Sequence, residues 1–246
     1  MSKNTENFGF DEKNYLRILK KAISKYEILD IALCKFVAGE CIWRHDVDVS
    51  PQRAKKIAIL EKSMGVRAHY YFMFESRFYN LFEPQVVTLV REIADLGHHI
   101  GLHFDVSNIQ YLNKNSLESA ICLKQDIFKE LFGIEIQSLS IHDPTKIDEV
   151  FRTDQILGGL VNASADLYMN NFTYCSDSNG YWRYRALDEV IDDPATQSLY
   201  SLTHPEWWAP VDLRPSERIK RSIYGRAESV LLQFDIDLKK QNRHFF

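Results

Sequence analysis

Apolar positions along the chain follow two spacings, and their alternation predicts an α/β fold. Apolar groups three or four residues apart indicate amphipathic helices, whereas short runs rich in β-branched and aromatic residues indicate buried strands. Because helices separate most of the expected strands, these strands should run parallel, with right-handed crossovers. We expect helices at residues 11–25, 50–65, 83–96, 116–132, 146–158 and 215–240. We expect strands at residues 41–48, 66–74, 97–105, 134–141, 160–165, 172–176 and 197–203.

Residues at the ends of the helices support these ranges. Ser50 and Pro51 have the residue types preferred at the N-cap and first position of a helix, and Gly65 is placed to end that helix. Gly97 and Gly133 follow the third and fourth helical ranges, where a left-handed C-terminal residue is common.

The composition is that of a globular protein and argues against a nucleic-acid-binding protein. The 246 residues are 45% hydrophobic and 26% charged, as in ordinary globular proteins, and one domain can hold them. The net charge of -4 provides no basic surface for nucleic acid, so no nucleic-acid partner is expected.

The first residues contain no apolar run of the signal-peptide kind, and no later run reaches the length of a transmembrane segment. We therefore expect a cytoplasmic protein without a membrane span. The four cysteines are scattered without a CxxC pair, which argues against a zinc knuckle or a disulfide framework.

The first expected strand ends in two carboxylates, Asp46 and Asp48. Side chains two residues apart in a strand point the same way, so the two carboxylates share one side. Like charges at this distance need a proton or a cation between them, and a metal ion would serve. The alternative is that the pair only caps the following helix.

The segment 97–105 contains three histidines and an aspartate. In a helix, His99 and His103 would form a metal-binding pair one turn apart, but Gly97 and Gly101 favour a strand. In a strand, His99, His103 and Asp105 share one face, and the last two lie at its carboxyl end. The alternative for each histidine is a hydrogen-bonded core residue.

Three further strand ends carry polar groups: His142, Asp177 and His204. Parallel strands should bring all these ends to one rim of a barrel or curved sheet. One Asp and two His can hold a hydrolytic Zn²⁺ with open positions, while a second carboxylate and another His supply a base and an acid. Trp207 and Trp208, next to His204, suit a sugar platform or a packed core.

The motifs RHDVD, GHHIGLH, IHDP, SDSNGYW and LTH occur in this order between residues 44 and 204. In this arrangement the chain resembles the polysaccharide deacetylase superfamily (the NodB homology domain, carbohydrate esterase family 4), in particular a branch associated with surface polysaccharides. The resemblance implies a distorted (β/α)₇ TIM-like barrel and metal-dependent hydrolysis of an N-acyl amide on a sugar. It implies a barrel core at 41–208, a helical extension at 1–40 and a C-terminal helix at 209–246.

The resemblance also implies roles for individual residues. Asp46 would be the general base and His204 the general acid, while Asp48 and His103 would bind the metal. The expected ion is Zn²⁺, with Co²⁺ or Ni²⁺ as alternatives. Substrate contacts are expected from the following residues: Asp177, Trp182, Arg183 and Trp207.

Two departures from the family pattern affect the site. The usual second metal histidine, four residues after the first, falls on Ser107, and an Arg-Pro pair is replaced by His142, Asp143 and Pro144. We expect His142 to be the third ligand, with Asp105 as the alternative. Val47 also separates the two acidic residues of the first motif, which the family usually has adjacent.

The sequence therefore predicts a hydrolase that removes an acyl group, expected to be acetyl, from an amino sugar in surface polysaccharide biosynthesis. Its partner would be a carbohydrate. Two alternatives remain: a catalytically silent carbohydrate-binding relative, and a hydrolase of another non-peptide carbon–nitrogen bond.

Overall fold

The computed structural model describes residues 9–107, 113–143 and 152–243. Its helices are α1 (Glu12–Lys25), α2 (Pro51–Ser63), α3 (Pro84–Asp95), α4 (Lys114–Phe132), α6 (Asp166–Asn171), α7 (Leu187–Asp192) and α8 (Pro215–Lys240). Its strands are β1 (Glu27–Ile28), β2 (Glu40–Val47), β3 (His69–Phe72), β4 (His99–Asp105), β5 (Ser138–His142), β6 (Ile156–Leu157), β7 (Leu160–Asn162), β8 (Thr173–Ser176) and β9 (Leu199–Thr203). Three short 3₁₀ helices are η1 (Ile31–Leu33), η3 (Ser178–Gly180) and η4 (Pro205–Trp207).

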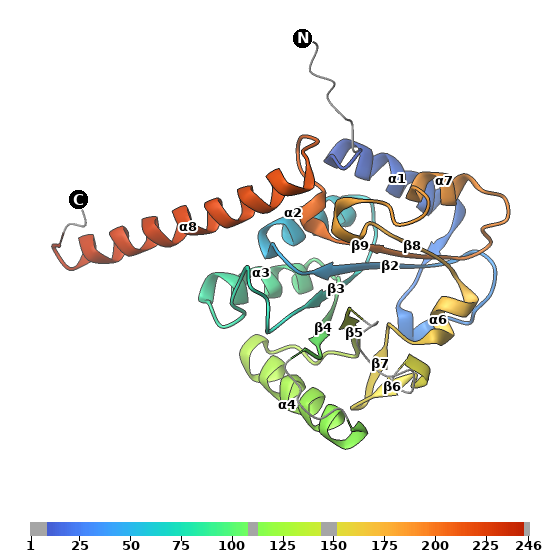
Figure 1. Cartoon of the computed structure of the whole chain (residues 1–246), viewed down its shortest axis with the longest axis horizontal. Coiled ribbons are helices and arrows are strands. Elements are labelled where there is room, and N and C mark those ends of the chain that lie inside the picture. Colours follow the sequence, from blue (N-terminus) through green and yellow to red (C-terminus); the bar gives the residue numbers. More distant parts are fainter. Residues whose placement is uncertain (1–8, 108–112, 144–151, 244–246) are drawn as a thin grey trace, which may run out of the picture.

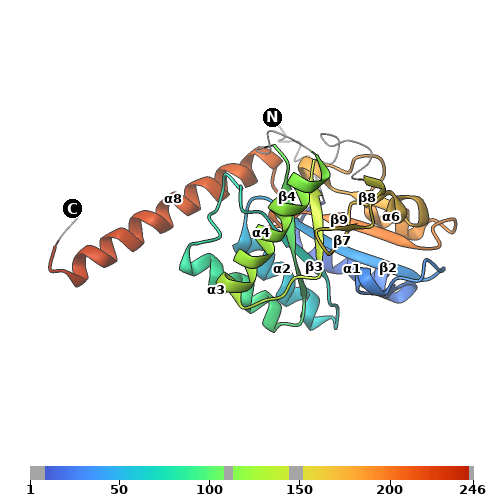
Figure 2. The same ribbon diagram turned by 90° about the horizontal axis from the view of Figure 1, so that it is seen from below.

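The strands form one curved sheet in the order β6-β7-β5-β4-β3-β2-β9-β8, with β1 added beside β2 (Figure 1). All the pairings are parallel except that of β6 with β7. The sheet curls into a half-barrel, which Figure 2 shows from a second side. The predicted α/β class, a distorted (β/α)₇ barrel, is confirmed in this curled form.

The side chains of β2 alternate between two hydrophobic layers, as a two-residue period requires. Cys41 and Trp43 enter the larger layer beneath the helices, whereas Ile42 enters a smaller layer on the inner face with Tyr71 and Tyr200. Arg44 and Asp46 continue the inner side of β2. Polar groups near the end of this strand are thereby directed into the curve of the sheet.

Most of the predicted elements are present, with shorter strands than expected. Ser50 is the N-cap of α2, where its side chain accepts a hydrogen bond from the backbone N–H of Arg53, and Pro51 is the first residue. Gly133 ends α4 in the left-handed conformation. The strands expected at 66–74 and 134–141 are limited to β3 and β5. The helix expected at 146–158 lies outside the described residues as far as residue 151, and its end is wrong, because Ile156–Leu157 form strand β6, which pairs with β7.

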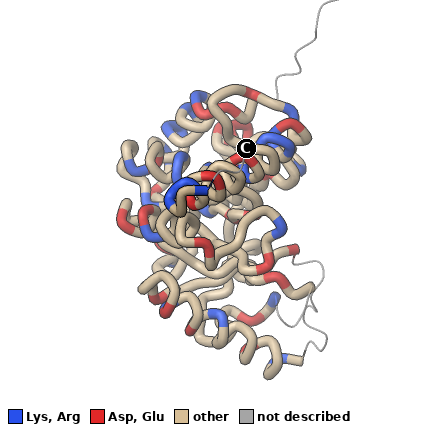
Figure 3. Tube along the Cα trace, turned by 90° about the vertical axis from the view of Figure 1, so that its left-hand side faces the viewer, with Lys and Arg blue, Asp and Glu red and all other residues tan. Residues whose placement is uncertain are grey.

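Helix α8 extends away from the body of the protein (Figure 1). Its outer half leaves Val230, Leu231 and Phe234 exposed. Within the described ranges, no helix has both the length and the apolar character that a membrane crossing requires. Acidic and basic residues are intermixed along the trace in Figure 3.

Candidate active site

The carboxyl ends of β2, β4, β5 and β9 meet at one rim of the sheet. Their parallel register pairs His103 with Ser140 and Asp105 with His142 across β4 and β5. Beside β2, His45 pairs with Thr203, the residue before His204. Polar groups that are far apart in the sequence are thereby brought together, as the pattern of strand ends predicts.

Asp48, His103 and His142 form a group of possible metal ligands that we call the rim group. His103 Nε2 lies 3.0 Å from His142 Nδ1 and 3.2 Å from Asp48 Oδ1. His142 Nδ1 lies 3.8 Å from Asp48 Oδ1. Two ligand atoms held by a tetrahedral ion at about 2.0–2.1 Å lie about 3.3 Å apart, so these spacings suit one small divalent cation.

The donors of the rim group also have the chemistry that a cation needs. The buried Oδ1 of Asp48 has no hydrogen-bond partner among the described residues. Ser140 donates to Asp46 Oδ1 at 3.2 Å, so its oxygen is free to accept Nδ1–H of His103, 2.7 Å away. With its proton on Nδ1, His103 presents an Nε2 lone pair to Asp48 and His142. An outer hydrogen bond of this kind commonly fixes the tautomer of a metal-binding histidine.

The alternative third ligand, Asp105, is outside the rim group among the described residues. Its Oδ1 accepts a hydrogen bond of 2.8 Å from the backbone N–H of Ser107, which is exposed. The residues of the structure thus fit a divalent ion through His142, the ligand that the sequence favours.

Asp46 is buried beside the rim group and is held by Arg44 of the same strand. Nε and Nη2 of Arg44 donate to the two carboxylate oxygens at 2.8 and 2.7 Å. Burial by itself would raise the pKa of Asp46, but the charge and hydrogen bonds of Arg44 hold it well below its usual range. Asp46 Oδ2 is 3.7 Å from His103 Nε2. A carboxylate that is ionised and fixed in this position can accept a proton at the site.

His204 lies beside Asp48 of the rim group. Its Nε2 is 3.8 Å from Asp48 Oδ2, and its Nδ1 is 2.7 Å from Asp177 Oδ1. Burial opposes the charged imidazole, but the hydrogen bond and charge of Asp177 outweigh it and raise the pKa of His204 to about 10. The imidazole therefore carries a proton near neutral pH and can donate it from Nε2.

Asp177 is fully buried, and its carboxylate is surrounded by donors. The backbone N–H of His204 donates to it at 3.0 Å, and Nε1–H of Trp208 donates at 3.0 Å. This geometry suits a residue that orients His204, in addition to the substrate contact expected for the motif.

The other expected substrate residues are Trp182, Arg183 and Trp207. Trp182 is half-buried and stacks on Phe10 with ring centroids 5.2 Å apart. Arg183 is exposed and lies over the ring of Tyr184, 5.5 Å from its centroid. Trp207 is buried in η4. Nothing in the structure tests their contact with a substrate, so these roles stay predictions.

Three residues of the site are absent from the set that the sequence predicts. Arg44 and Ser140 each precede a predicted residue by two positions on the same strand, so the two-residue period places them on the same face and could have identified them. Glu206 is buried near Asp48 and His204. Burial, followed by the charge of Asp48, raises the pKa of Glu206 well above its ordinary value, so this carboxyl is neutral. Glu206 lies in the short helix η4, where no spacing of residues in the sequence indicates which way its side chain points.

Searches with this chain find similar folds but no family model and no matching curated protein. A family 4 carbohydrate esterase from Bacillus anthracis has 16% identity and a TM-score of 0.46, with coverage of 98% of this chain and 92% of that one. A polysaccharide deacetylase from Bacillus cereus has 14% identity and a TM-score of 0.47, with coverage of 83% and 89%. A family 4 pseudoenzyme from Bacillus anthracis has 12% identity and a TM-score of 0.47, with coverage of 77% and 60%.

All of these neighbours are family 4 carbohydrate esterases or relatives. This is the superfamily that the sequence motifs resemble. With identities below 25% and TM-scores below 0.5, the neighbours establish no activity for this chain.

Proposed function

We propose that this protein is a metal-dependent hydrolase that removes an N-acyl group, expected to be acetyl, from an amino sugar. The observation that carries the proposal is the rim group, in which an unpartnered buried Asp48 oxygen faces two imidazole nitrogens between an anionic carboxylate and a protonated histidine. The order of motifs along the chain supports the substrate class. A role in surface polysaccharide biosynthesis in the cytoplasm belongs to the same proposal.

Asp48, His103 and His142 would hold the ion, expected to be Zn²⁺, with Co²⁺ or Ni²⁺ as alternatives. Such an ion, when bound, polarises an amide carbonyl and lowers the pKa of water. Asp46 would accept the proton of the attacking water, because Arg44 keeps its carboxylate ionised and oriented.

His204 would give a proton to the departing amine. Asp177 holds Nδ1 of the imidazole, so the proton that is free to leave is on Nε2, on the side of Asp48. The proposed base and the proposed acid thus each lie within 4 Å of a ligand of the rim group, Asp46 beside His103 and His204 beside Asp48.

The proposal is tested by metal content and acetate release measured on the same preparations. Untagged protein, Asp48→Ala and His142→Ala are prepared without chelator, analysed for metal, and incubated with N-acetylglucosamine oligomers. We expect acetate release from the wild type and its loss, with loss of the rim ion, in both variants. Asp105→Ala is the matched control and should keep both.

Three outcomes would contradict the proposal or its third ligand. A wild type that takes up no ion at the rim when Zn²⁺, Co²⁺ or Ni²⁺ is offered would favour a silent carbohydrate-binding protein. A rim ion without acetate release, together with hydrolysis of a cyclic amide, would favour another carbon–nitrogen hydrolase. Retention of the ion by His142→Ala and its loss from Asp105→Ala would make Asp105 the third ligand.

A further inference from the structure

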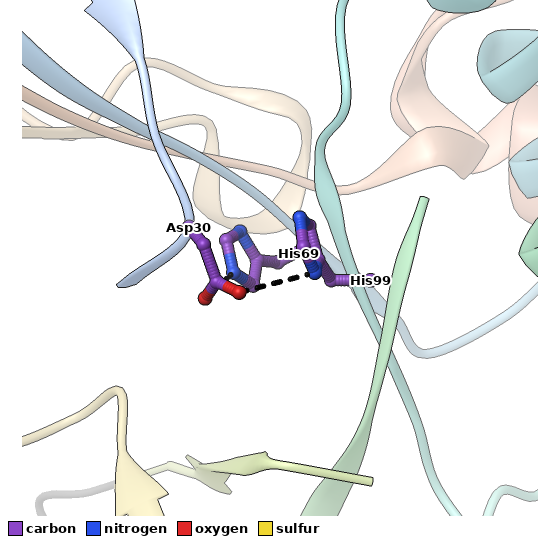
Figure 4. Close-up of side chains that lie close together, drawn as sticks. All are labelled: Asp30, His69 and His99. Carbon is purple, nitrogen blue, oxygen red and sulfur yellow. Dashed lines mark hydrogen bonds and ion pairs between the residues drawn. The ribbon is translucent and has the colours of Figure 1, made fainter. Parts of the chain in front are cut away.

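A second Asp–His–His group lies at the opposite end of the sheet and shares strand β4 with the rim group. His69 is the first residue of β3 and His99 the first residue of β4, and the parallel register pairs them directly. Asp30 precedes η1, in the segment that follows β1. Figure 4 shows the carboxylate of Asp30 reaching the two imidazoles from the neighbouring segment. We call these residues the N-terminal group.

The two groups are separated along the sheet. His99 and His103 are on the same face of β4, and four residues of extended strand span about 13 Å. Arg44 and Tyr71 fill the inner face between them, with the guanidinium 5.3 Å from the ring centroid. The N-terminal group is therefore a distinct cluster, and the roles proposed for the rim residues do not involve it.

The spacing of the donor atoms suits one small cation. Asp30 Oδ1 lies 3.3 Å from His69 Nε2, and Asp30 Oδ2 lies 3.3 Å from His99 Nδ1. The separation of two ligand atoms on a tetrahedral Zn²⁺ is also about 3.3 Å. The three potential ligand atoms all lie within 4.8 Å of one another.

The hydrogen bonding of His69 is incompatible with any single protonation state. The backbone N–H of Ile31 points at Nε2 from 3.2 Å, which requires a lone pair there, yet Asp30 Oδ1 also faces Nε2. A proton on Nε2 would satisfy Asp30 but oppose the N–H of Ile31. The other nitrogen, Nδ1, is buried without a partner in the described part of the chain. A cation at Nε2 would offset the facing oxygen and nitrogen lone pairs, and it would replace the Ile31 N–H there, because an imidazole nitrogen has one lone pair.

An ion could also reach this position. The side chains of His99 and Asp30 are 24% and 25% exposed, whereas that of His69 is 2% exposed. One buried ligand and two that are about a quarter exposed leave an open side for a water or another ligand.

We infer that Asp30, His69 and His99 bind a second divalent transition-metal ion, of the Zn²⁺ class, that joins the segment after β1 to β3 and β4. Two imidazoles and one carboxylate favour Zn²⁺, Ni²⁺, Co²⁺ or Cu²⁺ over Mg²⁺ or Ca²⁺. Binding here needs none of the acid and base groups of the rim, so it does not depend on the proposed activity.

The test is Zn²⁺ stoichiometry in protein whose rim group has been removed. Asp48→Ala/His142→Ala, dialysed against Zn²⁺, should retain about one equivalent by elemental analysis. Adding Asp30→Asn or His99→Gln should weaken this binding more than the roughly 100-fold typical of outer-shell changes. Glu27→Gln, which removes an exposed carboxylate from β1, is the matched control and should leave binding unchanged.

The inference would be overturned if Asp48→Ala/His142→Ala is shown by circular dichroism to be folded and binds no Zn²⁺. The N-terminal group would then be an ion-pair cluster only. Binding that survives both Asp30→Asn and His99→Gln would overturn it as well. Because His99 is partly exposed, His99→Gln is expected to fold even if Asp30→Asn does not. Substituting Co²⁺ for Zn²⁺ adds a spectroscopic readout of tetrahedral coordination that a structural ion pair would not give.

Discussion

The rim group and the N-terminal group have the same residue types at opposite ends of one sheet and share strand β4, but their surroundings differ. At the rim, Ser140 hydrogen-bonds His103, and the pairs Arg44–Asp46 and Asp177–His204, which contain the proposed base and acid, lie beside the group. At the other end, the rings of His69 and His99 stack with centroids 4.7 Å apart, and the surrounding donors are backbone N–H groups. A metal-ligand set alone therefore does not indicate catalysis.

The two groups differ in whether acidic and basic side chains that can exchange protons lie beside the ligands. Parallel strands offer their carboxyl ends to loops that carry polar residues, and here those loops bring Asp177, His204 and Glu206 to the rim. At the amino ends, the nearby segment contributes Asp30 but no further acid or base to the group, among the residues that the structure describes. We accordingly expect chemistry at one end and a stabilising role at the other.

The largest expected effect is that of Asp46→Asn, because it removes the base and leaves the rim ligands in place. We expect kcat for acetate release to fall about 10²- to 10⁴-fold while the metal content of both groups is unchanged. The measurement is steady-state kinetics beside elemental analysis.

Asp46→Asn also leaves the buried Arg44 without its partner, and breaking such a pair costs roughly 3–5 kcal/mol. The double variant Arg44→Met/Asp46→Asn controls for this loss, since it removes both members of the pair. It should recover thermal stability but not activity. If it recovers activity, Asp46 is not the base, and the contrast between the two groups disappears.

Asp177→Asn is expected to have the next largest effect, through the pKa of His204. The pKa of His204 is raised from 6.5 to about 10, first by Asp177 and then by the charge of Asp48, so the pair with Asp177 contributes stability that is fully present below pH 6.5 and is lost as the pH rises through about 10. In urea unfolding of metal-free protein, the difference between wild type and variant should therefore be largest below pH 6.5 and should narrow towards pH 10.

The alkaline limb of kcat/KM should also move to lower pH in Asp177→Asn, because its His204 loses the proton earlier. The side-chain amide introduced by this substitution keeps an oxygen that can accept the indole N–H of Trp208, so packing is largely kept. His204→Gln is the matched control and should abolish the limb. An unchanged limb in Asp177→Asn would mean that another group provides the acid.

Much of the fold could be predicted from the sequence because its signals are local. The range 215–240 matches α8, and the Ser50–Pro51 start of α2 follows from capping chemistry. The convergence of Asp48, His103 and His142 follows from parallel topology. Asp30 could not be identified in this way, because its position depends on the two-residue strand β1 pairing with β2, a contact without periodic signal.

The roles of side chains are harder to predict than their positions. The sequence favours Trp207 for the substrate contact, yet Trp208 is the tryptophan that hydrogen-bonds Asp177, since the direction of each indole depends on the turn of η4. The choice between His142 and Asp105 likewise needs the structure, because adjacent parallel strands place both near His103.

Ser140→Ala should have a smaller effect and should separate the two groups directly. Losing an outer hydrogen bond to a metal-binding histidine typically costs 10- to 100-fold, so we expect about that loss of Zn²⁺ affinity at the rim. Binding by the N-terminal group should not change, because Ser140 contacts only His103 and Asp46 among the groups discussed. Zn²⁺ titration of Ser140→Ala in the Asp30→Asn and His142→Ala backgrounds measures each group alone. Equal losses in both backgrounds would contradict the local role of Ser140.

Gly101→Ala is expected to have the smallest effect and to act on both groups together. Gly101 lies midway between His99 and His103 on β4, and an added Cβ would lie 2.5 Å from Tyr71 Cδ1 and 2.8 Å from the carbonyl oxygen of Ser138. Such overpacking costs about 1–3 kcal/mol of unfolding free energy, which urea denaturation can measure. Because the backbone of β4 must shift, the affinities of both groups for Zn²⁺ should fall in parallel. If Zn²⁺ affinity falls in only one group, the backbone of β4 has shifted near that group alone. The positions of the two groups would then not be coupled through β4.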